Sequence, residues 1–107
     1  MYLTKYFITL VVEDDLYSVN EYLKYRIDLP TSILEPEEGP VSIFLEDEWF
    51  NILADMSEVS AAFKENLMEI RAFGQGAGDI SVIFAKNGNV DLTNATINWP
   101  EYDGILD

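Results

Sequence analysis

The chain of 107 residues is long enough for one domain with a hydrophobic core, since 49% of its residues are hydrophobic and 13% aromatic. Twenty acidic side chains against six basic ones give a formal net charge of −14, and the bases are scattered, which disfavours binding to nucleic acid or to an anionic membrane surface. The chain has no cysteine and no histidine, which rules out disulfides, thiolate zinc sites and thiol catalysis.

The N-terminal region has the composition of a strand. Residues 6–12 are rich in β-branched and aromatic side chains and predict a buried strand. This run follows one lysine and stops at Glu13, which fits neither a signal peptide nor a membrane span. We therefore expect a cytoplasmic protein.

The next segment predicts a helix that begins at Asp15 or Ser18 as N-cap and ends before Pro30. Its apolar side chains recur on one helical face: Val19, Tyr22, Leu23 and Ile27. Residues 29–40 hold three prolines and a glycine and predict a long surface connection. The acidic, proline-rich part of this segment, EPEEGP, is interpreted as a plain connection.

The second half predicts a strand over residues 41–46, an ambiguous stretch over 48–56, and a helix over 57–73 with Ser57 as cap. The apolar positions of that helix are Val59, Ala62, Phe63, Leu67, Ile70 and Phe73.

A β-hairpin follows over 79–99, because Asn-Gly between two alternating segments is a strong hairpin signal. The order β-α-β-α-β-β predicts an α+β fold, with a four-stranded sheet, two helices on one face and a C-terminal hairpin. We expect a single domain over residues 1–107, with 98–107 as an acidic and aromatic tail.

An acidic triplet follows each of the first two strands: Glu13, Asp14 and Asp15 after one, Glu46, Asp47 and Glu48 after the other. If the strands are parallel, all six carboxylates meet at one edge of the sheet; if antiparallel, the triplets lie at opposite ends. We favour the parallel arrangement. The acids are then solvated strand ends, a Mg²⁺ or Ca²⁺ site, or a docking surface for a basic protein, and the last fits the charge of the whole chain best.

Aromatic side chains extend the predicted docking surface, because binding hot spots favour Trp and Tyr. Trp49 adjoins the second triplet, and Glu21, Tyr25 and Asp28 share the helix face opposite the apolar stripe. Trp99 and Tyr102 lie among acids in the tail. The two triplets and these six residues form the predicted partner-binding set, and no catalytic residue, metal or cofactor is assigned.

These features favour an inhibitor of a basic protein, most plausibly an immunity protein or antitoxin that neutralises a nuclease toxin. The chain is similar in kind to bacterial immunity proteins, which are small acidic inhibitors of secreted toxins. One alternative is a DNA mimic of the anti-restriction or anti-CRISPR sort, although Lys64 and Arg71 interrupt the acidic stripe of the predicted second helix. Others are a carboxylate metal protein or enzyme, and a halophilic or structural domain. The oligomeric state stays open.

Overall fold

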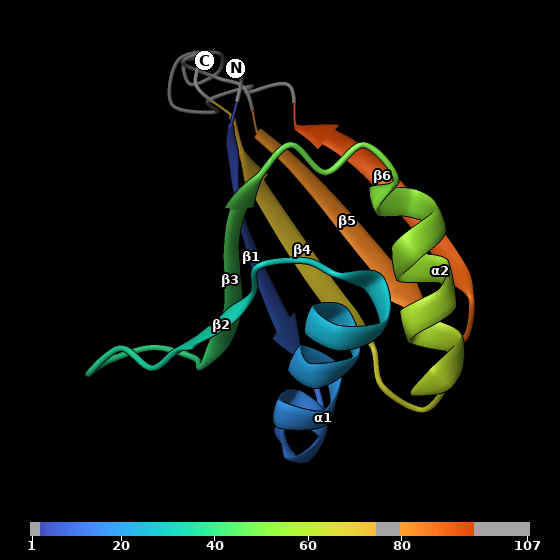
Figure 1. Cartoon of the computed structure of the whole chain (residues 1–107), viewed down its shortest axis with the longest axis horizontal. Helices are drawn as coiled ribbons and strands as arrows, with labels where there is room; N and C mark the ends of the chain where they lie inside the picture. The colour runs from blue at the N-terminus through green and yellow to red at the C-terminus, as the bar shows by residue number, and fades with distance from the viewer. Residues whose placement is uncertain (1–2, 75–79, 96–107) are drawn as a thin grey trace, which may run out of the picture.

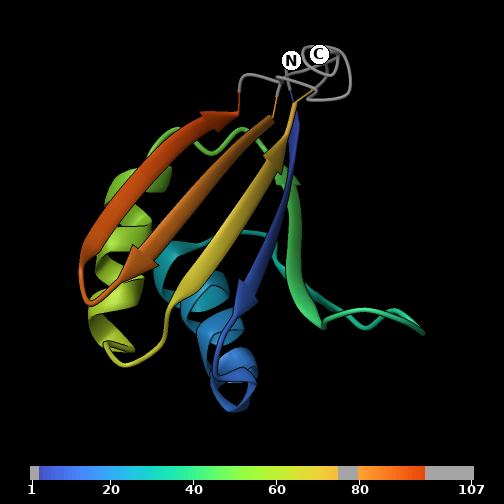
Figure 2. The ribbon, with the colours of Figure 1, turned by 180° about the vertical axis from the view of Figure 1, so that it is seen from behind.

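Six antiparallel strands form one sheet in the order β2-β3-β1-β4-β5-β6 in the computed structural model, which describes residues 3–74 and 80–95, without the side chains of 94 and 95. Helices cover one face of this sheet and leave the other face uncovered (Figures 1 and 2). The elements are β1 (Thr4–Leu10), η1 (Glu13–Asp15), α1 (Leu16–Glu21), η2 (Tyr22–Ile27), β2 (Ser32–Leu34), β3 (Ser42–Asp47), α2 (Ile52–Ala62), β4 (Met68–Phe73), β5 (Ile80–Lys86) and β6 (Asn89–Ala95). The α+β class with helices on one face is confirmed, and the described sheet is larger than the four strands predicted.

The core lies between the sheet and the helices. One residue from each strand forms a transverse row on the helix-covered face: Ile33, Ile43, Ile8, Ile70, Ile83 and Leu92. The four central members are buried, whereas Leu92 at the β6 edge is exposed. Branched side chains fill such a pleated surface well, so this row fixes the register of the sheet.

The first helix has the predicted stripe. Val19 and Leu23 are buried, and Tyr22 and Ile27 pack against the core from its margin. The segment continues from α1 into the π-helical turn η2 and ends at Asp28, which has a left-handed φ of 76°. Of the two predicted caps, Asp15 occupies the N-cap position of α1, although its side chain makes no capping hydrogen bond there.

The predicted helix over 57–73 is wrong at both ends. Helix α2 begins at Ile52, with Ser57 inside it instead of at its cap, and stops at Ala62. The chain turns after α2, and residues 68–73 form β4, which pairs with β1 on one side and β5 on the other. Met68, Ile70 and Ala72 are buried, and the residues between them face the other way. Met, Glu, Arg and Ala favour helices intrinsically, but pairing on both edges overrides that local preference.

The C-terminal hairpin is confirmed over the residues that the structure describes. Asn87 and Gly88 connect β5 to β6 with φ values of 51° and 86°, the two positive angles of a type I′ turn. The predicted connection over 29–40 holds a further short strand, β2, which pairs with β3. None of the helices in the described ranges is long and apolar enough to cross a membrane.

Candidate partner-binding surface

An acidic hairpin loop projects from the body of the protein between β2 and β3 (Figure 1). We call residues 35–40 the acidic arm; all six are exposed, and three of them, Glu35, Glu37 and Glu38, are acidic. Pro36 and Pro40 restrict φ, and Gly39 adopts a φ of 106°, which a residue with a side chain rarely adopts. The arm therefore presents three carboxylates on a loop of restricted shape.

One hydrogen bond connects the arm to the helical layer. Tyr17 of α1 donates its hydroxyl hydrogen to Oε2 of Glu35 at 2.8 Å. This bond, together with the negative charge of Glu35, raises the pKa of Tyr17 above its ordinary value. The base of the arm is thus attached to α1.

The sheet face opposite the helices, here the open face, carries a cluster of phenylalanines. The ring of Phe7 in β1 lies 5.1 Å from that of Phe44 in β3 and 5.7 Å from that of Phe73 in β4, between centroids. Thr9 lies on the same face of β1 as Phe7, and it is paired with Glu69 of β4, which is paired with Phe84 of β5. Because residues paired across a sheet share a face, Phe84 is exposed on the open face as well. An aromatic surface without helices above it is the composition expected of a binding surface.

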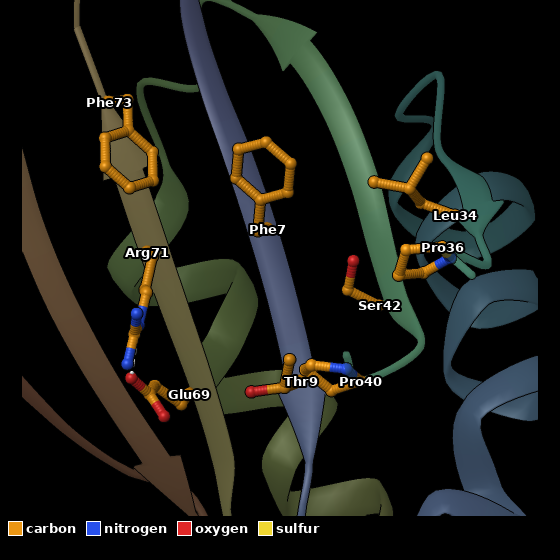
Figure 3. A pocket seen from close by; sticks show the side chains of 9 residues that line it. All are labelled: Phe7, Thr9, Leu34, Pro36, Pro40, Ser42, Glu69, Arg71 and Phe73. Carbon is orange, nitrogen blue, oxygen red and sulfur yellow. Dashed lines mark hydrogen bonds and ion pairs between the residues drawn. The ribbon is translucent and has the colours of Figure 1, made fainter. Parts of the chain in front are cut away.

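A pocket of about 600 Å³ lies where the acidic arm meets the open face. Figure 3 shows its lining from β1, β2, β3, β4 and the arm: Phe7, Thr9, Leu34, Pro36, Pro40, Ser42, Glu69, Arg71 and Phe73. The two charged groups of this lining pair with each other, since Arg71 Nε lies 2.7 Å from Glu69 Oε2. The remaining walls are mostly apolar, and we call this hollow the arm pocket.

The predicted convergence of the two acidic triplets is wrong. Strands β1 and β3 are antiparallel, with Thr4 opposite Asp47 and Ile8 opposite Ile43. Glu46, Asp47 and Glu48 therefore lie where β1 begins, whereas Glu13, Asp14 and Asp15 lie beyond its other end. The triplets form two separate acidic ends, and the parallel crossover we favoured does not exist.

One member of the first triplet has a structural contact. Asp15 Oδ2 accepts a hydrogen bond from Asn66 Nδ2 at 3.1 Å. The same amide group donates to the carbonyl of Val12 at 2.8 Å and accepts from its N–H at 3.0 Å. Asp15 thus helps to fix the turn after β1, while Glu13 and Asp14 are exposed.

The two aromatic residues after β3 have opposite environments. Trp49 is only 5% exposed, packs edge-on against Tyr6 at 5.2 Å and donates its indole N–H to Asp55 at 2.7 Å. Phe50 is 84% exposed and borders a small second pocket with Glu48. Trp49 therefore belongs to the core and offers a partner little area. Phe50 adjoins the same triplet but is absent from the predicted set, because the sequence does not reveal which of the two neighbours faces solvent.

The predicted helix face is present in part. Glu21 in α1, Tyr25 in η2 and Asp28 are all exposed, but Asp28 lies just beyond η2 in a left-handed conformation, so only the first two belong to the helical segment. The remaining two predicted residues, Trp99 and Tyr102, lie outside the described residues.

The described ranges contain no group of three acidic side chains placed to hold a metal ion. Within these described ranges, clusters of acidic residues lie on the arm and at the two ends of the β1–β3 pair. A scan against models of protein families, a search of curated proteins and a search of solved structures found no match to this chain.

Proposed function

We propose that this protein binds a basic protein through its acidic arm and so inhibits it, as an immunity protein or antitoxin does with a nuclease toxin. The observation that carries the proposal is the projection of Glu35, Glu37 and Glu38 from the body on a loop held by two prolines. A nuclease needs a cationic cleft for phosphate, and a projecting group of carboxylates complements such a cleft in charge and in shape.

The charge of the whole chain supports the same partner. With a net charge of −14, the protein attracts a cationic surface over a Debye length, about 10 Å at 0.1 M salt. Electrostatic steering of this kind raises association rates well above those of neutral pairs. Rapid capture is what protection against a toxin requires.

A local patch fits the distribution of acids better than a DNA mimic does. Duplex DNA carries one charge per roughly 1.7 Å of its axis, so a mimic needs a long, regular row of carboxylates. In the described part of the chain the acidic clusters lie on the arm and at both ends of the β1–β3 pair, and the remaining acids are scattered singly over the helices, the other strands and their connections. We therefore favour docking through the arm.

The test compares two triple variants of equal net charge. In the arm variant Glu35, Glu37 and Glu38 become Gln; in the control variant Glu13 and Glu65 become Gln and Asp14 becomes Asn. Each is used at low salt to capture partners from host lysate, and the captured protein is then purified. Its association rate and its nuclease activity are measured with wild type and with both variants.

We expect association with the arm variant to be slower by at least about tenfold, with much less change for the control variant, because the arm enters the cationic cleft. We also expect wild type to suppress cleavage of nucleic acid by the partner. Equal rates for the two variants would remove the arm from the proposal. A captured partner with no basic surface would overturn the inhibitor reading itself.

A further inference from the structure

We infer that the arm pocket receives an apolar side chain of the basic partner, flanked in the partner's sequence by lysine or arginine that meets the acidic arm. This inference rests on the proposed function and adds the chemistry of the bound segment. It follows from three features of the pocket: apolar walls, a charge-compensated side on β4, and a rim formed by the acidic arm.

The walls are apolar and supported from behind. Leu34 is 43% exposed at one side of the pocket and Phe73 is exposed at the other, with Phe7 between them (Figure 3). Phe7 makes ring contacts with Phe44 of β3 and Phe73 of β4, so its position is fixed from both flanking strands. A pocket with walls already ordered loses little side-chain entropy when it is filled.

The side of the pocket formed by β4 does not select for a charged ligand (Figure 3). Glu69 and Arg71 form an ion pair at 2.7 Å, so their charges compensate each other. The side chain of Arg71 is largely exposed, and a pair of this kind is weak. This side therefore offers neither a net anion site nor a net cation site, and an apolar group fits there best.

One rim of the pocket is formed by the arm, which carries negative charge. Pro36 and Pro40 line the pocket, and Glu37 and Glu38 lie between them in the sequence, whereas Glu35 accepts a hydrogen bond from a tyrosine of the helical layer. An occupant that buries an apolar side chain beside this rim gains further if its neighbouring residues are cationic. A second copy of this chain would instead bring another charge of −14 to the same place. The charge of the rim thus selects a basic segment.

The experiment titrates the isotopically labelled full chain with three capped hexapeptides, observed by NMR. The peptide KKLFKK carries both features, KKGGKK has the charges without apolar side chains, and SSLFSS has the apolar side chains without charges. The observed signals are the methyl groups of Leu34, the rings of Phe7 and Phe73, and the Nε–H of Arg71. Titrations are repeated with Leu34→Gln and with Leu53→Gln, a matched control on α2 that is 44% exposed.

We expect KKLFKK to bind roughly tenfold more tightly than either other peptide, as burial of one apolar side chain allows. Its binding should shift the pocket signals. Leu34→Gln should abolish this advantage, and Leu53→Gln should retain it. The chain should remain monomeric in sedimentation velocity throughout.

Each other outcome overturns the inference in a different way. If KKGGKK binds as tightly as KKLFKK, the arm acts by charge alone, and the proposed function stands without the pocket. If SSLFSS binds as tightly, the pocket is an apolar site that is indifferent to charge. Absence of KKLFKK binding also overturns the inference, and so does dimerisation of the chain that Leu34→Gln abolishes. The proposed function is decided separately, by the comparison of the arm variant with its control variant.

Discussion

At the scale of single residues, the buried side chain of Asn66 connects two segments of the described chain. Asn66 is 1% exposed, and its side chain makes three hydrogen bonds, two with Val12 and one with Asp15. These bonds hold the end of β1 against the turn that precedes β4. A buried amide with all these partners is costly to truncate, because the truncation also leaves groups of Val12 without their bonds.

We expect Asn66→Ala to lower the free energy of unfolding by about 2 kcal/mol, as measured by urea denaturation. Asn51→Ala is the matched control, because Asn51 is exposed and makes no capping hydrogen bond at the start of α2. Its effect should stay within about 0.5 kcal/mol. Similar losses for the two variants would show that the contacts of Asn66 contribute nothing special.

The hydrogen bond between Tyr17 and Glu35 gives a second prediction at this scale. Glu35→Gln removes the charge that raises the pKa of Tyr17, so that pKa should fall toward its ordinary value of 10.0. Glu37→Gln on the same arm should leave it unchanged. The pKa is measured by NMR of labelled tyrosine rings, with Tyr17→Phe for assignment, and equal values in the two variants would contradict the contact.

The pH dependence of this bond has a definite sign. The pKa of Tyr17 in the folded protein is raised above 10.0, so its contribution to stability is complete below pH 10. The contribution is lost as the pH rises through the folded-state pKa, because the phenolate no longer donates to Glu35 and repels it. The attachment of the arm to α1 is therefore intact at neutral pH.

At the scale of elements, α2 is tied to the turn of the C-terminal hairpin by two serines. Ser57 Oγ donates to the carbonyl of Gly88 at 2.8 Å, and Ser60 Oγ accepts from the N–H of Gly88 at 2.9 Å. Both backbone groups of one turn residue are thus bonded to one helix. This explains how α2 is positioned over β5 and β6.

We expect Ser60→Ala to lower the free energy of unfolding by about 1 kcal/mol and to speed hydrogen exchange at the Gly88 amide, which loses its acceptor. Ser18→Ala on α1 is the control, since Ser18 is exposed. Unchanged exchange at Gly88 in the Ser60 variant would mean that the hairpin holds its turn without α2.

How far each element is predictable from the sequence depends on how local its cause is. The Asn87-Gly88 turn and the stripe of Val19 and Leu23 are decided within a few residues, and both predictions are confirmed. Residues 68–73 have helix-favouring composition and become a strand only because β1 and β5 pair with them, which no local pattern contains.

The same limit applies to the binding surface. The sequence predicted docking by carboxylates, but the direction of β3 relative to β1 decided that the triplets separate. The segment EPEEGP was interpreted as a plain connection, and it carries the acidic arm. Its two prolines, its glycine and its acids can be seen in the sequence. Its projection beside the phenylalanines of the open face depends on the tertiary structure.

At the scale of the whole molecule, self-repulsion opposes the compact state. Glu69 and Arg71 form an ion pair, against a net charge of −14 for the chain. Charges of one sign at this density destabilise a small domain at low ionic strength. Stability should therefore respond strongly to salt.

We expect the melting temperature to rise as NaCl increases from about 0.01 M to about 1 M, over which the Debye length falls from about 30 Å to about 3 Å. A variant with Glu13→Gln, Asp14→Asn and Glu37→Gln, three exposed acids, should start from a higher melting temperature at low salt and respond less. Thermal unfolding followed by circular dichroism measures both. A melting temperature independent of salt in wild type would refute self-repulsion as a major cost.

The antiparallel order of the sheet also matters while the chain is being synthesised. Strand β1 leaves the ribosome before the other strands, and its partners β3 and β4 begin only at Ser42 and Met68, so at about 5–20 residues per second the apolar strand waits for seconds before both of its edges are paired. An unpaired strand of this composition is prone to aggregate. Glu13, Asp14 and Asp15 follow it directly, and acids in that place act as gatekeepers against association of nascent chains.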